Sequence, residues 1–223
     1  IQRAAIDGMK RVVLELGGKA PTIILPDADL DKAIPVALMS GFANSGQACV
    51  AGTRILAPRS RLPEIAERLR TATEKFKVGD PRDPEVRIGP LASLAQWERI
   101  QTYIRLGVEE GATLLTGGTG RPAGIEKGWF ARPTIFADVT NEMRIAREEI
   151  FGPVLCLLAY EDEDEAVEIA NDSDYGLQAY VLGSDLRRAE HIAARLMAGR
   201  VVVNGAPHDP RAPFGGFKQS GIG

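Results

Sequence analysis

The feature that most constrains the fold is a regular alternation of short β-rich runs with helical patterns along the 223 residues. Such alternation predicts βαβ units, in which successive strands lie parallel and the connecting helices cover the sheet. The predicted strands are Arg11–Leu16, Thr22–Leu25, Arg54–Ala57, Thr113–Leu115, Thr134–Phe136, Val154–Tyr160, Ala179–Leu182 and Arg200–Val203. The predicted helices are Leu30–Phe42, Pro63–Phe76, Leu94–Glu110, Glu163–Ala170 and Leu186–Met197. We therefore expect an α/β fold with a mainly parallel, twisted sheet and helices on both faces.

The charge balance and the apolar runs limit the kind of partner. The chain carries 27 basic and 30 acidic side chains, which are mixed along it and leave a net charge of −3. This distribution offers no electrostatic footprint for nucleic acid or an anionic membrane, so we expect neither partner. The longest apolar run, Val154–Ala159, is far shorter than the ~20 residues that cross a bilayer. We expect a soluble, cytoplasmic protein.

The cysteines and histidines lack the spacing of a metal site or of a disulfide framework. Only Cys49, Cys156, His191 and His208 are present, and they form no group with zinc-ligand spacing. We therefore predict no bound metal and treat each cysteine as a free thiol. A free cysteine is either a small buried hydrophobe or a reactive group.

The two cysteines differ in their sequence surroundings. Cys49 lies in Asn44–Gly52, a small and polar segment with glycines on both sides that let a substrate approach the backbone closely. Cys156 lies in an apolar run, where burial is the expected outcome. Cys49 is therefore the candidate nucleophile, and a buried structural thiol is the alternative.

Glu15 is the candidate base for that nucleophile. A thiol with a pKa of ~8.5 is only about 3% thiolate at pH 7, so a nucleophilic cysteine needs a base or a positive environment. Glu15 follows the apolar residues Val12–Leu14 and precedes a glycine pair, which predicts a carboxylate at the end of a strand. Ligands of open α/β sheets bind at the carboxyl ends of strands. The alternative is a solvated acid that pairs with Lys19.

A glycine-rich loop and three other segments indicate a functional site less specifically than Cys49 and Glu15 do. The segment Gly118–Ala123 fits the dinucleotide pattern G-x-G-x-x-A, but Pro122 breaks the helix that this pattern requires, so we predict a surface hairpin loop. The remaining candidates for a functional site are the acidic pair Glu148 and Glu149, Phe214 beside a glycine pair, and His208 in a proline-rich loop.

Four motifs, taken together, resemble the catalytic half of the aldehyde dehydrogenase superfamily. Their order and spacing agree with that family along essentially the whole chain. The motifs are Glu15–Lys19 (ELGGK), Gly46–Cys49 (GQAC), Glu148–Pro153 (EEIFGP) and Pro213–Gly221 (PFGGFKQSG).

The resemblance implies an oxidoreductase that uses NAD or NADP to convert a small-molecule aldehyde into a carboxylic acid. Cys49 would attack the carbonyl to form a thiohemiacetal, which passes hydride to the nicotinamide and becomes a thioester. Glu15 would activate the thiol and afterwards the hydrolytic water. The backbone N–H of Cys49 would supply half of an oxyanion hole.

The resemblance also implies roles for neighbouring residues. Glu149 is similar to the carboxylate that holds the nicotinamide ribose, and Phe151 to the ring beside the nicotinamide. Leu16 and Gly17 would complete this part of the cofactor site. The residues implied to line the substrate pocket are Ala48, Val50, His208 and Phe214.

Family members carry roughly as many residues again before position 1, including the glycine-rich dinucleotide site, and a further stretch at the other end. We therefore expect residues 1–17 to end a cofactor-binding domain, residues 18–223 to form the catalytic domain, and the parent protein to be a homo-oligomer, a dimer or tetramer. This piece alone is expected to be inactive in hydride transfer, because the nicotinamide must be held close to the reacting carbon.

Two alternative functions remain open. One is a coenzyme A-acylating aldehyde dehydrogenase, against which Glu15 argues, and the other is a non-catalytic folded module.

Overall fold

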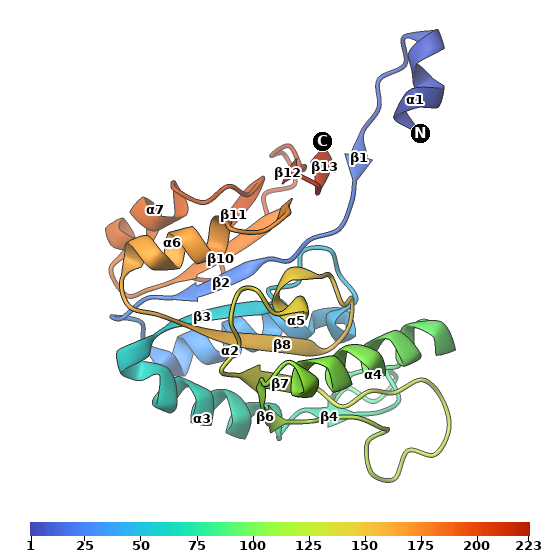
Figure 1. Ribbon diagram of the computed structural model, residues 1–223, viewed down its shortest axis with the longest axis vertical. Helices are drawn as coiled ribbons and strands as arrows, with labels where there is room; N and C mark the ends of the chain where they lie inside the picture. The colour runs from blue at the N-terminus through green and yellow to red at the C-terminus, as the bar shows by residue number, and fades with distance from the viewer.

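The computed structural model describes all 223 residues and has a seven-stranded sheet at its centre (Figure 1). Its strands are β2 (Pro21–Ile24), β3 (Arg54–Pro58), β6 (Thr113–Thr116), β7 (Thr134–Ala137), β8 (Val154–Tyr160), β10 (Gln178–Leu182) and β11 (Arg200–Val203). They lie in the order β11-β10-β2-β3-β8-β7-β6, and only β6 and β7 pair antiparallel. The predicted mainly parallel α/β sheet is confirmed.

Two hydrophobic cores lie on opposite faces of this sheet, because successive side chains of a strand point to opposite sides. In β8, Leu155 and Leu157 face one core, whereas Val154, Cys156 and Leu158 face the other. The first core is covered by α2 (Leu30–Phe42) and α3 (Leu62–Thr73), and the second by α4 (Leu94–Glu109), α5 (Arg144–Arg147), α6 (Glu163–Asn171) and α7 (Leu186–Ala193). The predicted helices on both faces are confirmed.

Capping side chains determine where most of the long helices begin. Asp29, Ser93, Asp162 and Asp185 each accept a hydrogen bond from a backbone N–H in the first turn of α2, α4, α6 and α7. The predicted helix Leu186–Met197 extends too far, because α7 ends at Ala193. The following residues form turns closed by hydrogen bonds from an N–H to the carbonyl three residues earlier.

Several short elements lie outside the main sheet. β1 (Leu14–Glu15) pairs antiparallel with β13 (Gly221–Ile222), and β9 (Tyr175–Gly176) pairs with β12 (Phe217–Lys218). The others are α1 (Gln2–Ala5), β4 (Lys77–Val78), β5 (Val86–Ile88) and the 3-10 turns Ile6–Gly8, Ala43–Gly46 and Arg59–Arg61. Figure 1 shows α1 extending away from the body of the molecule.

The predicted strand Arg11–Leu16 is wrong in length and in place. Only Leu14 and Glu15 form strand pairs, and their partner is the C-terminal β13 instead of the main sheet. Val13 is 65% exposed, because no strand of the main sheet lies beside it.

The glycine-rich loop after β6 forms the predicted hairpin connection to β7. Gly118, Gly120, Gly124 and Gly128 all have a positive φ, and no helix begins among them. The chain contains no helix that is both long and apolar enough to cross a bilayer.

Candidate active site

The predicted motifs meet at one edge of the main sheet. The first motif leads into β2, the Cys49 segment into β3 and the Glu149 segment into β8, while Tyr175–Leu177 leads into β10. These four strands are parallel neighbours, so the segments that precede them all lie at the same edge. Glu15 ends a strand as expected, but that strand is the two-residue β1, which lies outside the main sheet. The motifs gather at the amino ends, opposite to the usual ligand edge of an open α/β sheet.

Cys49 lies in a tight loop between α2 and β3. Asn44 and Ser45 have left-handed φ angles of 53° and 58°, which cost backbone energy for residues that have a side chain. The Ser45 hydroxyl donates to Gly89 O at 3.1 Å and accepts from Gly89 N at 3.0 Å, and Asn44 Nδ2 donates to Gln47 O at 2.9 Å. These bonds hold the loop in its strained shape, with Cys49 half-buried.

Two glycines let the other motifs approach this loop. A Cβ atom on Gly18 would overlap the carbonyl oxygen of Cys49, and one on Gly46 would overlap the carbonyl oxygen of Gly152. Gly18 N also donates to Glu149 Oε1 at 3.0 Å. The ELGGK, GQAC and EEIFGP motifs are therefore in mutual contact, although more than 100 residues separate the first from the last.

The Cys49 thiol lies in an environment that disfavours its ionised form. Burial raises its pKa above the ordinary value, and the carboxylates of Glu149 and Glu15 raise it further. Hydrogen bonds from the N–H groups of Cys49 and Val50 act in the opposite direction. Both carboxylates are thus close enough to interact electrostatically with the sulfur. The thiol is protonated at neutral pH and needs a proton acceptor before it reacts.

Glu15 and Lys19 do not pair, which corrects the alternative drawn from the sequence. Glu15 is exposed and forms no ion pair, whereas the Lys19 side chain is buried in the interior. Cys156 is also fully buried, as predicted, and its Sγ donates to Ile145 O at 3.2 Å.

The first two turns of α4 hold the Glu149 segment in place. Gln96 Nε2 donates to Ile150 O at 3.0 Å and to Phe151 O at 2.6 Å, and Arg99 Nη2 donates to Glu149 O at 2.6 Å. Phe151 has a left-handed φ of 62°, an uncommon conformation for an aromatic residue, and its ring is partly exposed. Sequence reasoning missed Gln96 and Arg99, because a polar residue near the start of an amphipathic helix carries no distinguishing signal.

Ser220 lies between β12 and β13 and connects this C-terminal segment to the segment that bears Glu15. Its buried hydroxyl donates to Gly17 O at 2.7 Å and accepts from Gly176 N at 3.0 Å, and its carbonyl accepts from Leu16 N at 3.1 Å. This serine belongs to a motif that was recognised in the sequence, but its role depends on chain segments that only the fold brings together.

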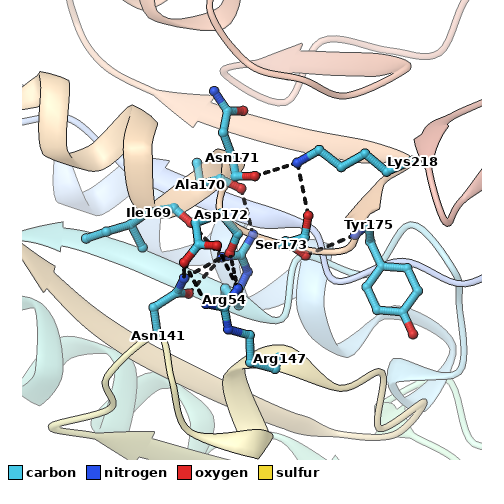
Figure 2. Close-up of polar contacts among 10 residues, drawn as sticks. All are labelled: Arg54, Asn141, Arg147, Ile169, Ala170, Asn171, Asp172, Ser173, Tyr175 and Lys218. Atoms are coloured by element: carbon cyan, nitrogen blue, oxygen red, sulfur yellow. Dashed lines mark hydrogen bonds and ion pairs between the residues drawn. The ribbon is translucent and has the colours of Figure 1, made fainter.

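A polar cluster around the buried side chains of Arg54 and Asn141 anchors β12, as Figure 2 shows. Five successive carbonyl groups, Ile169–Ser173 at the end of α6, accept hydrogen bonds from Arg54, Asn141, Arg147 and Lys218. Cationic side chains complement the negative end of a helix dipole. Because Lys218 belongs to β12, the cluster fixes β12 relative to α6. Sequence reasoning did not single out any of these four residues as part of the site.

The remaining predicted pocket residues have different surroundings. Ala48 and Val50 flank Cys49 and are half-buried, and Leu16 is exposed. His208 and Phe214 lie in an exposed loop, where His208 contacts Arg200. Their place in a substrate pocket stays a prediction.

The sequence and the fold match known proteins over the whole chain. The sequence profile described as the aldehyde dehydrogenase family matches residues 1–223. The chain belongs to this family. It is 52% identical over 223 residues to a 3-succinoylsemialdehyde-pyridine dehydrogenase from a Pseudomonas species, and it spans 47% of that protein's length.

Solved structures of aldehyde dehydrogenases share the fold. A mutant of aldehyde dehydrogenase C from Pseudomonas syringae, in complex with NAD+ and octanal, is 50% identical and has a TM-score of 0.96. A Mycobacterium tuberculosis aldehyde dehydrogenase in complex with NAD+ is 49% identical and also has a TM-score of 0.96. This chain is covered completely in both comparisons and corresponds to 46% of each of those chains.

Proposed function

We propose that this aldehyde dehydrogenase oxidises a small-molecule aldehyde to a carboxylic acid, with Cys49 as the nucleophile, Glu15 as the base and NAD or NADP as the oxidant. The supporting observation is the half-buried Cys49 thiol, whose pKa is raised in part by the carboxylates of Glu149 and Glu15. When bound, the nicotinamide accepts a hydride from the substrate carbon. The NAD+ complexes of similar structures favour this type of cofactor.

The proton steps follow from the groups around the thiol. Glu15 accepts the thiol proton while Cys49 Sγ forms a bond to the carbonyl carbon. The negative charge that develops on the substrate oxygen is stabilised by the backbone N–H of Cys49, which donates to no backbone carbonyl. Glu15, which is exposed, releases the thiol proton to solvent. After oxidation of the thiohemiacetal, it takes a proton from water, and the water oxygen attacks the thioester carbon. The acid then leaves, and a proton returns to the sulfur.

Glu149 and Phe151 fit the nicotinamide end of the cofactor. Glu149 uses Oε1 to accept the Gly18 N–H, whereas its Oε2 accepts no hydrogen bond and is available to ribose hydroxyl groups. The exposed ring of Phe151 offers a flat apolar surface for the nicotinamide. Gly17 lies against Glu149 Oε2, where a Cβ atom would overlap it, and its neighbour Leu16 is exposed. The division into residues 1–17 and residues 18–223 stays a prediction.

The exposure of Glu15 favours hydrolysis over transfer of the acyl group to coenzyme A. A hydrolytic route requires a base that reaches water, and the Glu15 carboxylate is exposed and unpaired. A thiol acceptor such as coenzyme A needs no such base.

Alkylation with iodoacetamide tests the nucleophile without any cofactor. We expect Cys49 to react at least ~100-fold faster than Cys156, because buried structural thiols are inert. The C49A variant should lose the fast reaction, while the matched C156A variant should keep it. Slow and equal labelling of both thiols, measured by mass spectrometry, would refute the proposal in favour of a non-catalytic module.

The E15Q variant tests the base through two readouts that move in opposite directions. Loss of the negative charge should lower the pKa of Cys49, so alkylation should reach its half-maximal rate at a lower pH. Turnover of p-nitrophenyl acetate should fall on the order of 100-fold, because hydrolysis of the thioester loses its base. An unchanged turnover rate would exclude Glu15 from that role.

A further inference from the structure

A cavity of about 450 Å³ opens at the surface where α4 and α5 meet, and none of its lining residues belongs to the Cys49 loop. Three arginines line it, Arg99 and Arg105 of α4 and Arg144 of α5. The one carboxylate in the wall is that of Glu109. The wall therefore carries more positive than negative charge, and the catalytic pair does not account for it.

One buried tyrosine holds two of these guanidinium groups in place. Arg99 Nη2 donates to Tyr103 Oη at 3.2 Å, and Arg99 Cζ lies 4.9 Å from the centre of the tyrosine ring. Tyr103 Oη donates to Glu148 Oε2, and the Glu148 carboxylate also pairs with Arg144 Nε at 2.7 Å. Both guanidinium groups are thus fixed before a ligand binds, which lowers the entropy that binding costs.

Each of the three guanidinium groups keeps a donor for a ligand. Nη1 forms no hydrogen bond in Arg99, Arg105 or Arg144, because their contacts use only Nε and Nη2. Arg99 and Arg105 also form no ion pair, and Arg105 Nη2 donates only to the Thr102 hydroxyl at 3.1 Å. A guanidinium is donor-only, so the group that these free donors fit is an anion.

A phosphate group suits three guanidinium groups better than a carboxylate does. A phosphomonoester carries a charge of about −1.5 to −2 at neutral pH and three acceptor oxygens, so it can accept from several arginines at once. A carboxylate carries one charge and two oxygens. The cavity has about 15 times the ~30 Å³ that one water molecule occupies in the liquid, which leaves room for an organic body beside the phosphate.

The Glu109 carboxylate indicates what this organic body carries. It lines the cavity, is exposed and forms no hydrogen bond or ion pair, so it is free to accept from hydroxyl groups. We propose that the cavity binds a small phosphorylated polyol of the sugar phosphate class, with its phosphate on the three arginines and its hydroxyl groups on Glu109. This site does not depend on the proposed role of Cys49.

Isothermal titration calorimetry in a phosphate-free buffer of low ionic strength tests the site with two probes, inorganic phosphate and glycerol 3-phosphate. We expect phosphate to bind with a Kd on the order of 1 mM, which two or three charge-assisted hydrogen bonds supply. Glycerol 3-phosphate should bind more tightly, because its hydroxyl groups reach Glu109, and added salt should weaken both probes. If neither probe binds, the proposal is wrong.

The R105Q variant tests whether the cavity, and not the charge of the surface in general, holds the anion. It removes a guanidinium that has no ion pair and should weaken both probes about tenfold, the effect of one charge-assisted hydrogen bond. R187Q is the matched control, since Arg187 is equally exposed and forms no ion pair, and it should bind like the wild type. Equal affinities in the two variants would overturn the proposal.

The E109A variant tests the recognition of the polyol separately from that of the phosphate. Loss of the carboxylate should leave the affinity for inorganic phosphate equal or higher, because a repelling charge is removed, while the preference for glycerol 3-phosphate should disappear. E98A, at an exposed acid of α4 outside the cavity, should keep that preference. A preference that survives in E109A would show that Glu109 does not bind the hydroxyl groups, which contradicts the proposed class of ligand.

Discussion

The interior around Arg54 and the sheet edge around Cys49 use polar groups in opposite ways. Arg54 is 1% exposed, and its Nε, Nη1 and Nη2 atoms all donate to oxygen acceptors. At the edge, the Glu15 carboxylate has no ion-pair partner, and Glu149 keeps one oxygen without a hydrogen bond. Polar groups that are fully paired hold the fold together. Those that are left unpaired at a solvent-exposed edge are available to a ligand.

The two cysteines show the same contrast. Cys156 lies in the middle of the sheet, where burial raises its pKa and a carbonyl accepts its S–H. Cys49 lies in a strained loop, half-buried and near two carboxylates. The same side chain is therefore fully enclosed in one region and partly accessible in the other.

Replacement of Arg54 is expected to have the largest effect on stability. The R54M variant loses four hydrogen bonds and leaves buried carbonyl oxygens without donors, so the free energy of unfolding should fall by about 3–5 kcal/mol. Urea unfolding followed by circular dichroism measures this. The control R59M removes an exposed ion pair and should cost less than about 1 kcal/mol. Equal losses in the two variants would contradict the contrast between interior and edge.

Lys19 is the exception within the interior, and it should make stability depend on pH. Its Nζ is buried without a hydrogen-bond partner, and burial lowers its pKa from 10.5 to about 8. Between these values the unfolded chain binds more protons, so stability rises with pH in this range. The cost of the buried charge, about 3 kcal/mol, is complete below pH 8 and disappears as the pH approaches 10.5.

The K19M variant isolates this effect. It should be more stable than the wild type at pH 7, and the difference should shrink between pH 8 and pH 10. Urea unfolding at several pH values measures the free energy of unfolding of both proteins. Taking the difference between the two proteins removes the contribution of other titrating groups. A difference that does not change with pH would show that the Lys19 amine is not buried in its charged form.

Ser220 should give the smallest change in stability. S220A removes the hydroxyl that bridges Gly17 and Gly176, at a cost of about 1–2 kcal/mol. The segment that bears Glu15 should also become less ordered, so hydrolysis of p-nitrophenyl acetate should slow while alkylation of Cys49 persists. S60A, at an exposed serine, is the control. If S220A matches S60A in both measurements, the C-terminal segment around Ser220 does not position Glu15.

Local sequence patterns predicted the long elements well. The strands Val154–Tyr160 and Arg200–Val203 and the helix Leu30–Phe42 have the predicted bounds, because their apolar spacing and capping residues act within the segment itself. The pairs β1–β13 and β9–β12 were not predicted. Each strand has only two residues, and its partner lies far away in the sequence, so no local pattern marks it.

The sequence by itself determined the alternation of strands and helices, the motifs that show the family, and which cysteine lies among small polar residues. Only the tertiary structure decided that these motifs meet at the amino ends of the strands, because that follows from the parallel order β10-β2-β3-β8. The fold likewise decided that Glu15 is exposed while Lys19, four positions later, is buried. Burial depends on what packs around a residue, and the groups that pack around Lys19 come from segments distant in the sequence.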